Sequence, residues 1–236
     1  MPAQGARDFL FLFPVRPFLC FTPPAMNILA IPCGPFAANA YLLVDEPSAT
    51  ALLVDPGADA DALLSSIRDN RATLAAILLT HAHPDHVSAL PALHDAFPSA
   101  PVYLHPADAA WLGSPANALP PFYPYQSALA SIPVFPPPTD LSLPPFRFTP
   151  LHTPGHTPGG IVWHAPDRSL AFTGDTLFAD SVGRTDLPGG DPAALQTSLA
   201  AITRALPPST TILPGHGPSA PFSEVLATNP FLQDLP

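Results

Sequence analysis

Proline is the residue that most restricts the fold of this chain, since 37 of its 236 residues are proline. A proline ring removes a backbone N–H donor and breaks the interior of a helix, so the helices and strands must be short. The composition is otherwise that of a folded protein, with 47% hydrophobic and only 11% charged residues. We therefore expect a loop-rich, globular single domain over residues 27–236.

The first 26 residues do not share the pattern of the rest of the chain. Their apolar run at 9–13 is cut short by Pro14 and Pro17 and is too short to cross a bilayer. It also lacks the long apolar stretch and the small-residue cleavage site of a secretory signal. We interpret residues 1–26 as a disordered extension or a misread start, and we expect a cytoplasmic protein.

The charge pattern argues against two classes of partner. All eight basic residues are arginine, lysine is absent and the net charge is −10. A surface that follows nucleic-acid phosphates or binds an anionic membrane needs clustered basic side chains, which this composition does not supply. The two cysteines, Cys20 and Cys33, lie in unrelated contexts and predict no disulfide framework. We expect a small-molecule substrate as the partner, and the sequence leaves the oligomeric state open.

Short apolar runs bounded by turn residues predict two groups of strands, each followed by helices. The predicted strands are 28–33, 40–45, 51–55, 75–80, 102–105, 147–152, 161–164, 169–173 and 211–213. The predicted helices are 59–70, 88–97, 107–112 and 193–206. The proline-rich residues 113–140 are expected to form an irregular rim. This succession of elements predicts the α/β class and a four-layer αββα sandwich.

Four polar clusters follow predicted strands, and each contains histidine or aspartate. They are THAHPDH at 80–86, HTPGHT at 152–157, TGDT at 173–176 and PGHG at 214–217. Imidazole nitrogen and carboxylate oxygen are ligands that zinc and similar divalent ions prefer. These donors suffice for two metal ions that share a bridging ligand.

The first cluster is compact in a way that suits metal binding. His81 and His83, two residues apart on an extended loop, can converge on one ion while Asp85 and His86 turn towards a second. A single loop histidine is usually an ordinary polar residue, but imidazoles packed this densely after a buried strand have little use except as ligands. We therefore predict that the four clusters meet at one edge of the sandwich.

Taken in order, these motifs resemble the metallo-β-lactamase superfamily, and most closely its type II glyoxalases (hydroxyacylglutathione hydrolases) in their short single-domain bacterial form. The resemblance covers nearly all of residues 27–236. It rests on THAHPDH at 80–86, TPGHTPG at 153–159, FTGDTLF at 172–178, GRTDLPGG at 183–190 and LPGHGP at 213–218. The implied ligands are His81, His83 and His156 for the first metal, Asp85, His86 and His216 for the second, and Asp175 as the bridge.

The resemblance also implies a reaction. Two divalent ions, zinc in the first place and iron or manganese as alternatives, would hold a bridging hydroxide that attacks a thioester carbonyl. Asp175 would fix the separation of the metals, and Asp85 would orient the hydroxide. The implied substrate is S-D-lactoylglutathione or a related acyl-glutathione. The longer type II glyoxalases hold glutathione with basic residues of a C-terminal helical domain, and this lysine-free sequence, which stops soon after His216, departs from them there.

Other functions share parts of these motifs. A glutathione persulfide dioxygenase carries the GRTD segment and would bind a single iron through His81, His156 and Asp175, although its PAHD motif differs from PGHG around His216. Lactonase and β-lactamase activities are further alternatives, and the second is disfavoured by the lack of an evident secretion signal. A non-catalytic binding module of this fold would be expected to lose ligands, whereas all seven positions are filled here.

Two features near the motifs fall outside the implied ligand set. Arg184 and Asp186 of GRTD could form an ion pair that holds their loop, or Arg184 could face the site, and we favour the ion pair. His152 lies four residues before His156 but matches no ligand position. This favours a structural or supporting role for His152.

We predict that His152→Ala retains both metals. Loss of a supporting partner weakens metal affinity or activity by about 10- to 100-fold, whereas loss of a direct ligand empties a site. Elemental analysis of the purified variant, beside His156→Ala, separates the two cases. If His152→Ala emptied a site while His156→Ala kept both metals, the ligand would be assigned to the wrong histidine.

Overall fold

The first sheet of the protein has six strands, in the spatial order β1-β2-β3-β4-β5-β6. The computed structural model describes residues 26–233 and residue 235, so the predicted extension lies outside the described residues except for Met26, which begins β1. The strands are β1 (Met26–Cys33), β2 (Ala38–Asp45), β3 (Thr50–Val54), β4 (Thr73–Leu78), β5 (Val102–Tyr103) and β6 (Val134–Phe135). The β1-β2-β3 pairs are antiparallel, and β3 to β6 pair in parallel.

The second sheet also has six strands, in the order β12-β11-β10-β9-β8-β7. They are β7 (Leu141–Leu143), β8 (Phe146–His152), β9 (Ile161–Ala165), β10 (Leu170–Gly174), β11 (Thr211–Pro214) and β12 (Ala220–Pro221). Only β10 and β11 pair in parallel. Each sheet therefore contains parallel neighbours whose carboxyl ends lie at the same edge.

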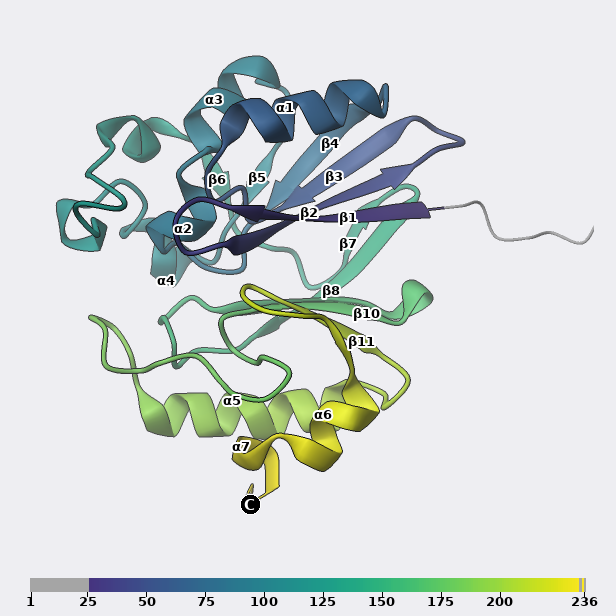
Figure 1. The fold of residues 1–236 in the computed structure, drawn as a ribbon, viewed down its shortest axis with the longest axis vertical. Coiled ribbons are helices and arrows are strands. Elements are labelled where there is room, and N and C mark those ends of the chain that lie inside the picture. The colour runs from purple at the N-terminus through teal and green to yellow at the C-terminus, as the bar shows by residue number, and fades with distance from the viewer. Residues whose placement is uncertain (1–25, 234, 236) are drawn as a thin grey trace, which may run out of the picture.

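Helices cover the outer face of each sheet, which makes the molecule four layers thick (Figure 1). α1 (Ala60–Asp69) and α3 (Leu90–Ala96) lie over the first sheet, and α5 (Pro192–Ala205), α6 (Phe222–Thr228) and α7 (Pro230–Gln233) lie under the second. Two further short helices, α2 (Pro84–Val87) and α4 (Pro106–Ala109), lie near the loops of the first sheet. The predicted αββα sandwich is confirmed.

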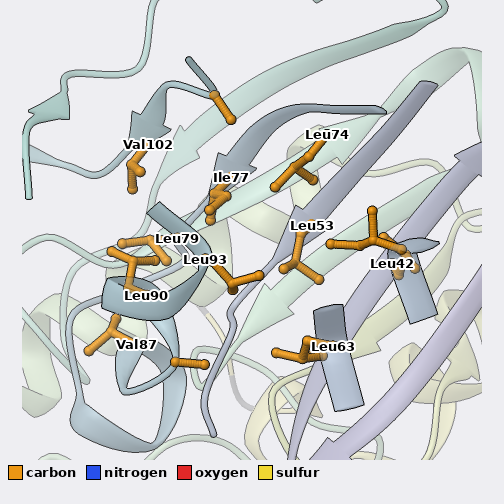
Figure 2. Packing of buried hydrophobic residues seen from close by; sticks show 14 of the residues in the cluster. Leu42, Leu53, Leu63, Leu74, Ile77, Leu79, Val87, Leu90, Leu93 and Val102 are labelled. Atoms are coloured by element: carbon orange, nitrogen blue, oxygen red, sulfur yellow. The ribbon is translucent and has the colours of Figure 1, made fainter. Parts of the chain in front are cut away.

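Three apolar cores separate the four layers, and alternating side chains of single strands supply two of them. On β2, Leu42 packs toward the helices while Leu43 packs between the sheets. Figure 2 shows Leu42 and Leu53 of the sheet beside Leu63 of α1. The third core lies between the second sheet and its helices. Because its two faces meet different layers, the inner strands of the first sheet are buried on both sides, and β2 is buried throughout, whereas the edge strand β1 is partly exposed.

The predicted elements correspond to observed ones, and the differences involve the shortest pieces. The rim at 113–140 contains two 3-10 helices, at Pro115–Asn117 and Ser127–Ser131, and the edge strand β6. The sequence did not predict β6, β7 or β12, because strands of two or three residues are too short to show an alternating pattern. It also missed α6 and α7. Among the described residues, no helix has both the length and the apolar character needed to cross a membrane.

The first polar cluster begins as a loop, where the sequence placed His81 and His83, and ends in a short helix that the sequence did not predict. Residues Pro84–Val87 form the short helix α2, and His83 lies at its N-cap. Pro84 is suited to the first helical turn because its φ is fixed and its missing N–H has no helical partner there. His81 thus lies in the loop before α2 and His83 on extended backbone at its N-cap, whereas Asp85 and His86 belong to the helical turn.

Trp163 of β9, in the second sheet, makes a hydrogen bond to the chain just after β4 of the first sheet, next to the first polar cluster. Its ring is fully buried in the core between the sheets, and its indole N–H donates to the carbonyl of Leu79, 3.0 Å away. Leu79 directly follows β4 and precedes Thr80 and His81. The bond therefore fixes the point at which the chain leaves the sheet towards the site.

We predict that Trp163→Phe lowers the free energy of unfolding by about 1–3 kcal/mol, the cost of leaving a buried acceptor unpaired. Denaturant unfolding of both proteins measures this difference. Tyr125→Phe is the control, because the Tyr125 side chain is 50% exposed and its substitution should change stability by less than about 0.5 kcal/mol. Equal effects of the two substitutions would contradict a structural role for the Trp163 hydrogen bond.

Candidate metal centre

The structure brings all four polar clusters to one edge of the sandwich. β4 ends just before its cluster, and β8, β10 and β11 end at the first residues of theirs; the parallel β3-β4 and β10-β11 pairs direct these ends to the same side. His83 Nδ1 lies 2.8 Å from His156 Nε2, although the two residues are 73 positions apart in sequence. His216 Nε2 lies 3.3 Å from an Asp85 carboxylate oxygen. The predicted convergence of the clusters is confirmed.

The converging side chains form two groups that could each hold a metal ion. The ligand atoms of His81, His83 and His156 all lie within 4.8 Å of one another, and all three side chains are buried. The second group is formed by Asp85, His86 and His216, within the same distance of one another. His216 is the most accessible of these six, with 28% of its side chain exposed.

Asp175 lies between the two groups. Its Oδ2 is 3.5 Å from Nε2 of His156 in the first group and 3.6 Å from Nε2 of His216 in the second. Its Oδ1 is 3.4 Å from Nε2 of His86. A carboxylate with oxygens facing both groups is placed as a bridging ligand needs to be. Gly215 permits this close approach, since a side chain there would collide with Asp175 and His86.

In three of these histidines Nδ1 lies on the outer side and has a hydrogen-bond partner, which leaves Nε2 free to face the centre. Nδ1 of His156 lies 2.7 Å from the Arg184 carbonyl, and Nδ1 of His216 lies 3.2 Å from the Phe36 carbonyl. Nδ1 of His81 is 3.0 Å from the Thr80 hydroxyl. Such partners fix the tautomer and ring orientation of histidines that bind metals.

Several of the inner atoms are buried without a hydrogen-bond partner. They include Nε2 of His81, Nε2 of His86 and Oδ1 of Asp175. A buried polar atom without a partner is costly, and metal ions held by the two groups would satisfy these atoms. These residues therefore fit one or two divalent cations.

Asp55 is a functional residue that sequence reasoning missed. It directly follows β3, and its carboxylate accepts hydrogen bonds from Thr80 N–H (2.7 Å), from the Thr80 hydroxyl (2.6 Å) and from Nδ1 of His86 (3.0 Å). Since the Thr80 hydroxyl in turn faces His81, one carboxylate orients a histidine of each group. Asp55 lies close enough to His81 and His86 to form a third candidate group, but its oxygens are already used by these bonds.

A second buried carboxylate holds two of the site loops together. Asp108, on α4, accepts hydrogen bonds from the backbone N–H of Ala82 (3.1 Å) and of Gly159 (2.5 Å). Ala82 lies between the first two histidines, and Gly159 follows His156 by three residues. The signal for Asp55 was its place in Asp-Pro-Gly at the end of a strand parallel to β4. No local pattern marked Asp108.

The burial and charge of the site set its protonation. Burial, with nearby imidazoles, lowers the pKa of His81 well below its ordinary value and the pKa of His83 to about 4. Burial also lowers the pKa of His86, but the Asp175 and Asp85 carboxylates outweigh it and raise this pKa well above the ordinary value. Burial raises the pKa of Asp175, whereas neighbouring imidazoles hold it well below its usual range. Ionised carboxylates and neutral imidazoles are the forms that bind metals, so protonation of His86 competes with metal binding.

A cavity of about 610 Å³ opens above the two groups, and its volume is that of a small-molecule site. His83, Asp85, His156, Asp175 and His216 form its polar floor. The surrounding walls are formed by Phe36, Leu119, Phe178, Gly183, Arg184 and Leu187.

His152 and Arg184 make contacts of the kind that the sequence favoured, a supporting contact for His152 and an ion pair for Arg184. The ring of His152 is exposed, its Nε2 lies 2.9 Å from the Pro158 carbonyl, and it stacks on His105 with 4.0 Å between ring centroids. His152 belongs to none of the candidate metal groups found among the described residues. The guanidinium of Arg184 pairs with both carboxylate oxygens of Asp186, at 2.6 Å each. Arg184 nevertheless also lines the cavity.

The fold and this site define a known class of protein. Residues 33–216 match the family model described as the metallo-beta-lactamase superfamily, and the chain belongs to this superfamily.

Curated relatives match the chain over nearly its whole length. It is 36% identical to the probable metallo-hydrolase YqgX of Bacillus subtilis, over 86% of this chain and 95% of that protein. It is 34% identical to the hydroxyacylglutathione hydrolase GloC of Haemophilus influenzae, over 88% of this chain and 98% of that protein.

Solved structures agree with this fold. The BLEG-1 B3 metallo-β-lactamase has a TM-score of 0.79 and 38% identity over 88% of this chain and all of that chain. TTHA1623 in a di-iron-bound form has a TM-score of 0.76 and 40% identity over 86% and 100%. ETHE1 from Myxococcus xanthus has a TM-score of 0.67 and 26% identity over 87% and 83%. The similarity extends to proteins with different names, so it identifies the superfamily and not the substrate.

We predict that Asp55→Asn weakens metal binding by about 10- to 100-fold, the usual effect of losing a partner that orients a ligand. An asparagine has one acceptor oxygen, so its amide N–H₂ would face a donor from Thr80 or His86. Competition with a chromophoric chelator measures the affinity.

The matched control is Asp45→Asn, at the opposite end of the β2-β3 pair. Asp45 is also buried, and it accepts hydrogen bonds from the N–H and hydroxyl of Ser48. Its substitution should leave metal affinity unchanged. Wild-type affinity in Asp55→Asn would show that its carboxylate does not orient the histidines.

Proposed function

We propose that this protein is a two-metal hydrolase of small thioesters. The single observation that carries the proposal is the position of Asp175, whose two oxygens face both His/Asp groups at the floor of a cavity of about 610 Å³. An arrangement that joins two groups through one carboxylate suits a pair of metal ions. A site for a single ion would have no use for the second group.

The residues of such a site would have different roles in hydrolysis. When bound, a pair of divalent ions supplies a hydroxide at neutral pH and polarises the substrate carbonyl. His81, His83 and His156 would bind one ion, Asp85, His86 and His216 the other, and Asp175 both. Asp85 also lines the cavity, where its carboxylate can accept a hydrogen bond from the attacking water and so orient it. Asp55 and Asp108 hold the loops that carry these side chains.

The first substrate to test is S-D-lactoylglutathione or a related acyl-glutathione. The similarity to a protein named hydroxyacylglutathione hydrolase supports this choice. Zinc is the first metal to test, because it favours imidazole and carboxylate ligands. Iron is the second, since a similar structure is described in a di-iron-bound form.

Three alternatives remain for the same site. A persulfide dioxygenase, suggested by the GRTD segment, would need one iron on His81, His156 and Asp175, and would leave the group of Asp85, His86 and His216 without a role. A β-lactamase is suggested by the likeness to BLEG-1, and a lactonase would use the same cavity. The dioxygenase is distinguished by metal content, and the others by the substrate hydrolysed.

We predict that the zinc-loaded protein contains two metal ions per chain and hydrolyses thioesters in preference to lactones and β-lactams. Elemental analysis and a panel of these three substrate classes test this. One iron per chain, with oxygen consumption on glutathione persulfide, would support the dioxygenase instead.

Asp175→Ala should lower kcat/KM by more than about 100-fold and reduce metal content, since a direct ligand of both ions is lost. The exposed Asp180→Ala serves as the control, and near-normal turnover of Asp175→Ala with two metals retained would refute the bridging role.

A further inference from the structure

The walls of the cavity beside His216 are aromatic. The carbonyl of Phe36 accepts a hydrogen bond from Nδ1 of His216, so this backbone is fixed to a candidate metal ligand. Phe178 approaches the same imidazole, with 6.3 Å between ring centroids. Both phenylalanines line the cavity, together with Leu119 and Leu187. Any substrate that reaches the floor must therefore pass apolar side chains.

Phe36 is held in place although 39% of it is exposed. Its ring packs against Phe122 and Tyr123, with centroid distances of 5.2 and 5.3 Å in tilted and edge-on geometry. The turn that carries it is closed by a hydrogen bond from Ala37 N–H to the Gly34 carbonyl. A fixed aromatic surface that opens into a cavity is suited to bind another apolar group, because little side-chain freedom is lost on contact.

Apart from the metal ions that the floor would hold, the side chains around the cavity offer little positive charge to an anionic carrier. Among the described residues that line it, Arg184 is the only arginine, and its guanidinium already donates to both oxygens of Asp186. The other charged groups in the lining are Asp85, Asp175 and the histidines of the floor. The whole chain has a net charge of −10. The carboxylates of a carrier such as glutathione therefore meet no unpaired arginine in this lining.

We propose that the substrates of this site are thioesters whose acyl group is uncharged, apolar and of about aromatic size, and that this group packs against Phe36 and Phe178. This inference rests on the proposed thioester hydrolysis. The oxygen of water bonds to the acyl carbon, the carbon–sulfur bond breaks, and the products are a carboxylic acid and a free thiol that takes up a proton. The thiol carrier adds little to binding through its charges.

Four thioesters test the proposal with the zinc-loaded full chain. They combine two acyl groups, lactoyl and phenylacetyl, with two thiols, anionic glutathione and neutral N-acetylcysteamine. We expect kcat/KM to be at least about 10-fold higher for phenylacetyl than for lactoyl on either thiol, which is the scale of discrimination that apolar pockets provide. Glutathione should give no advantage over N-acetylcysteamine.

Phe36→Ala keeps the carbonyl that holds His216 and removes only the aromatic wall. It should lower the ratio of phenylacetyl to lactoyl kcat/KM by about 10-fold, chiefly through KM. Phe135→Ala is the matched control, because Phe135 is 49% exposed and lies on β6 outside the cavity lining. Metal content and circular dichroism establish whether each variant is folded. If Phe36→Ala does not fold, the comparison of the four substrates on the wild-type protein still decides the question.

A second variant tests the charge argument without touching the aromatic wall. Asp186→Ala frees the guanidinium of Arg184, so it should raise kcat/KM for glutathione thioesters over N-acetylcysteamine thioesters by about two- to five-fold, the strength of an exposed ion pair. Asp180→Ala should leave that ratio unchanged.

The outcomes separate this inference from the proposed function. If none of the four thioesters is hydrolysed by protein with two metals, the proposed function fails. If lactoylglutathione is the best substrate and Phe36→Ala leaves the acyl ratio unchanged, thioester hydrolysis stands and the aromatic acyl preference is overturned.

Discussion

The carboxylate of Asp55 is the interaction on which the geometry of the site depends. Asp55 directly follows β3. Its carboxylate accepts hydrogen bonds from Thr80 and His86 at the point where the chain leaves the neighbouring β4. One buried anion thereby sets the path of the loop, the orientation of His86 and, through the Thr80 hydroxyl, that of His81. The parallel pairing of β3 and β4 places donor and acceptor at the same edge. The polar site is therefore built directly onto the apolar sheet.

This arrangement concentrates polar groups that would be unfavourable on their own. Imidazoles and carboxylates are buried side by side, and several inner nitrogens and oxygens have no hydrogen-bond partner. Leaving such atoms unpaired costs free energy that the apolar cores on either side must offset. Binding of a cation that contacts the folded site but not the unfolded chain would add to stability by mass action. Folding and metal binding should thus be coupled in this protein.

Much of the fold and of the candidate metal centre could be predicted from the sequence, because their signals are local. The run of apolar residues before His81 marks a buried strand, and H-x-H-x-D-H marks ligands within seven residues. Asp55 and Asp108 escaped notice because their partners lie 25 to 51 residues away. Asp55 at least lies in Asp-Pro-Gly at the end of a strand, whereas nothing in the neighbouring sequence identifies Asp108. The edge strand β6 was missed for a different reason, since two residues cannot display a period. The Arg184 and Asp186 pair, only two residues apart, was within reach of local reasoning.

Backbone carbonyls hold Nδ1 of two histidines. The Phe36 carbonyl bonds to His216, and the Arg184 carbonyl bonds to His156. The side chains of Phe36 and Arg184 face the cavity. In the proposed enzyme the main chain at these positions would support the metal ligands while the side chain would meet the substrate, and the two tasks can vary independently. Natural variants at positions 36 and 184 could therefore drift towards new substrates while the catalytic centre is inherited intact. Such a separation gives one scaffold a route to many specificities without passing through an inactive ancestor.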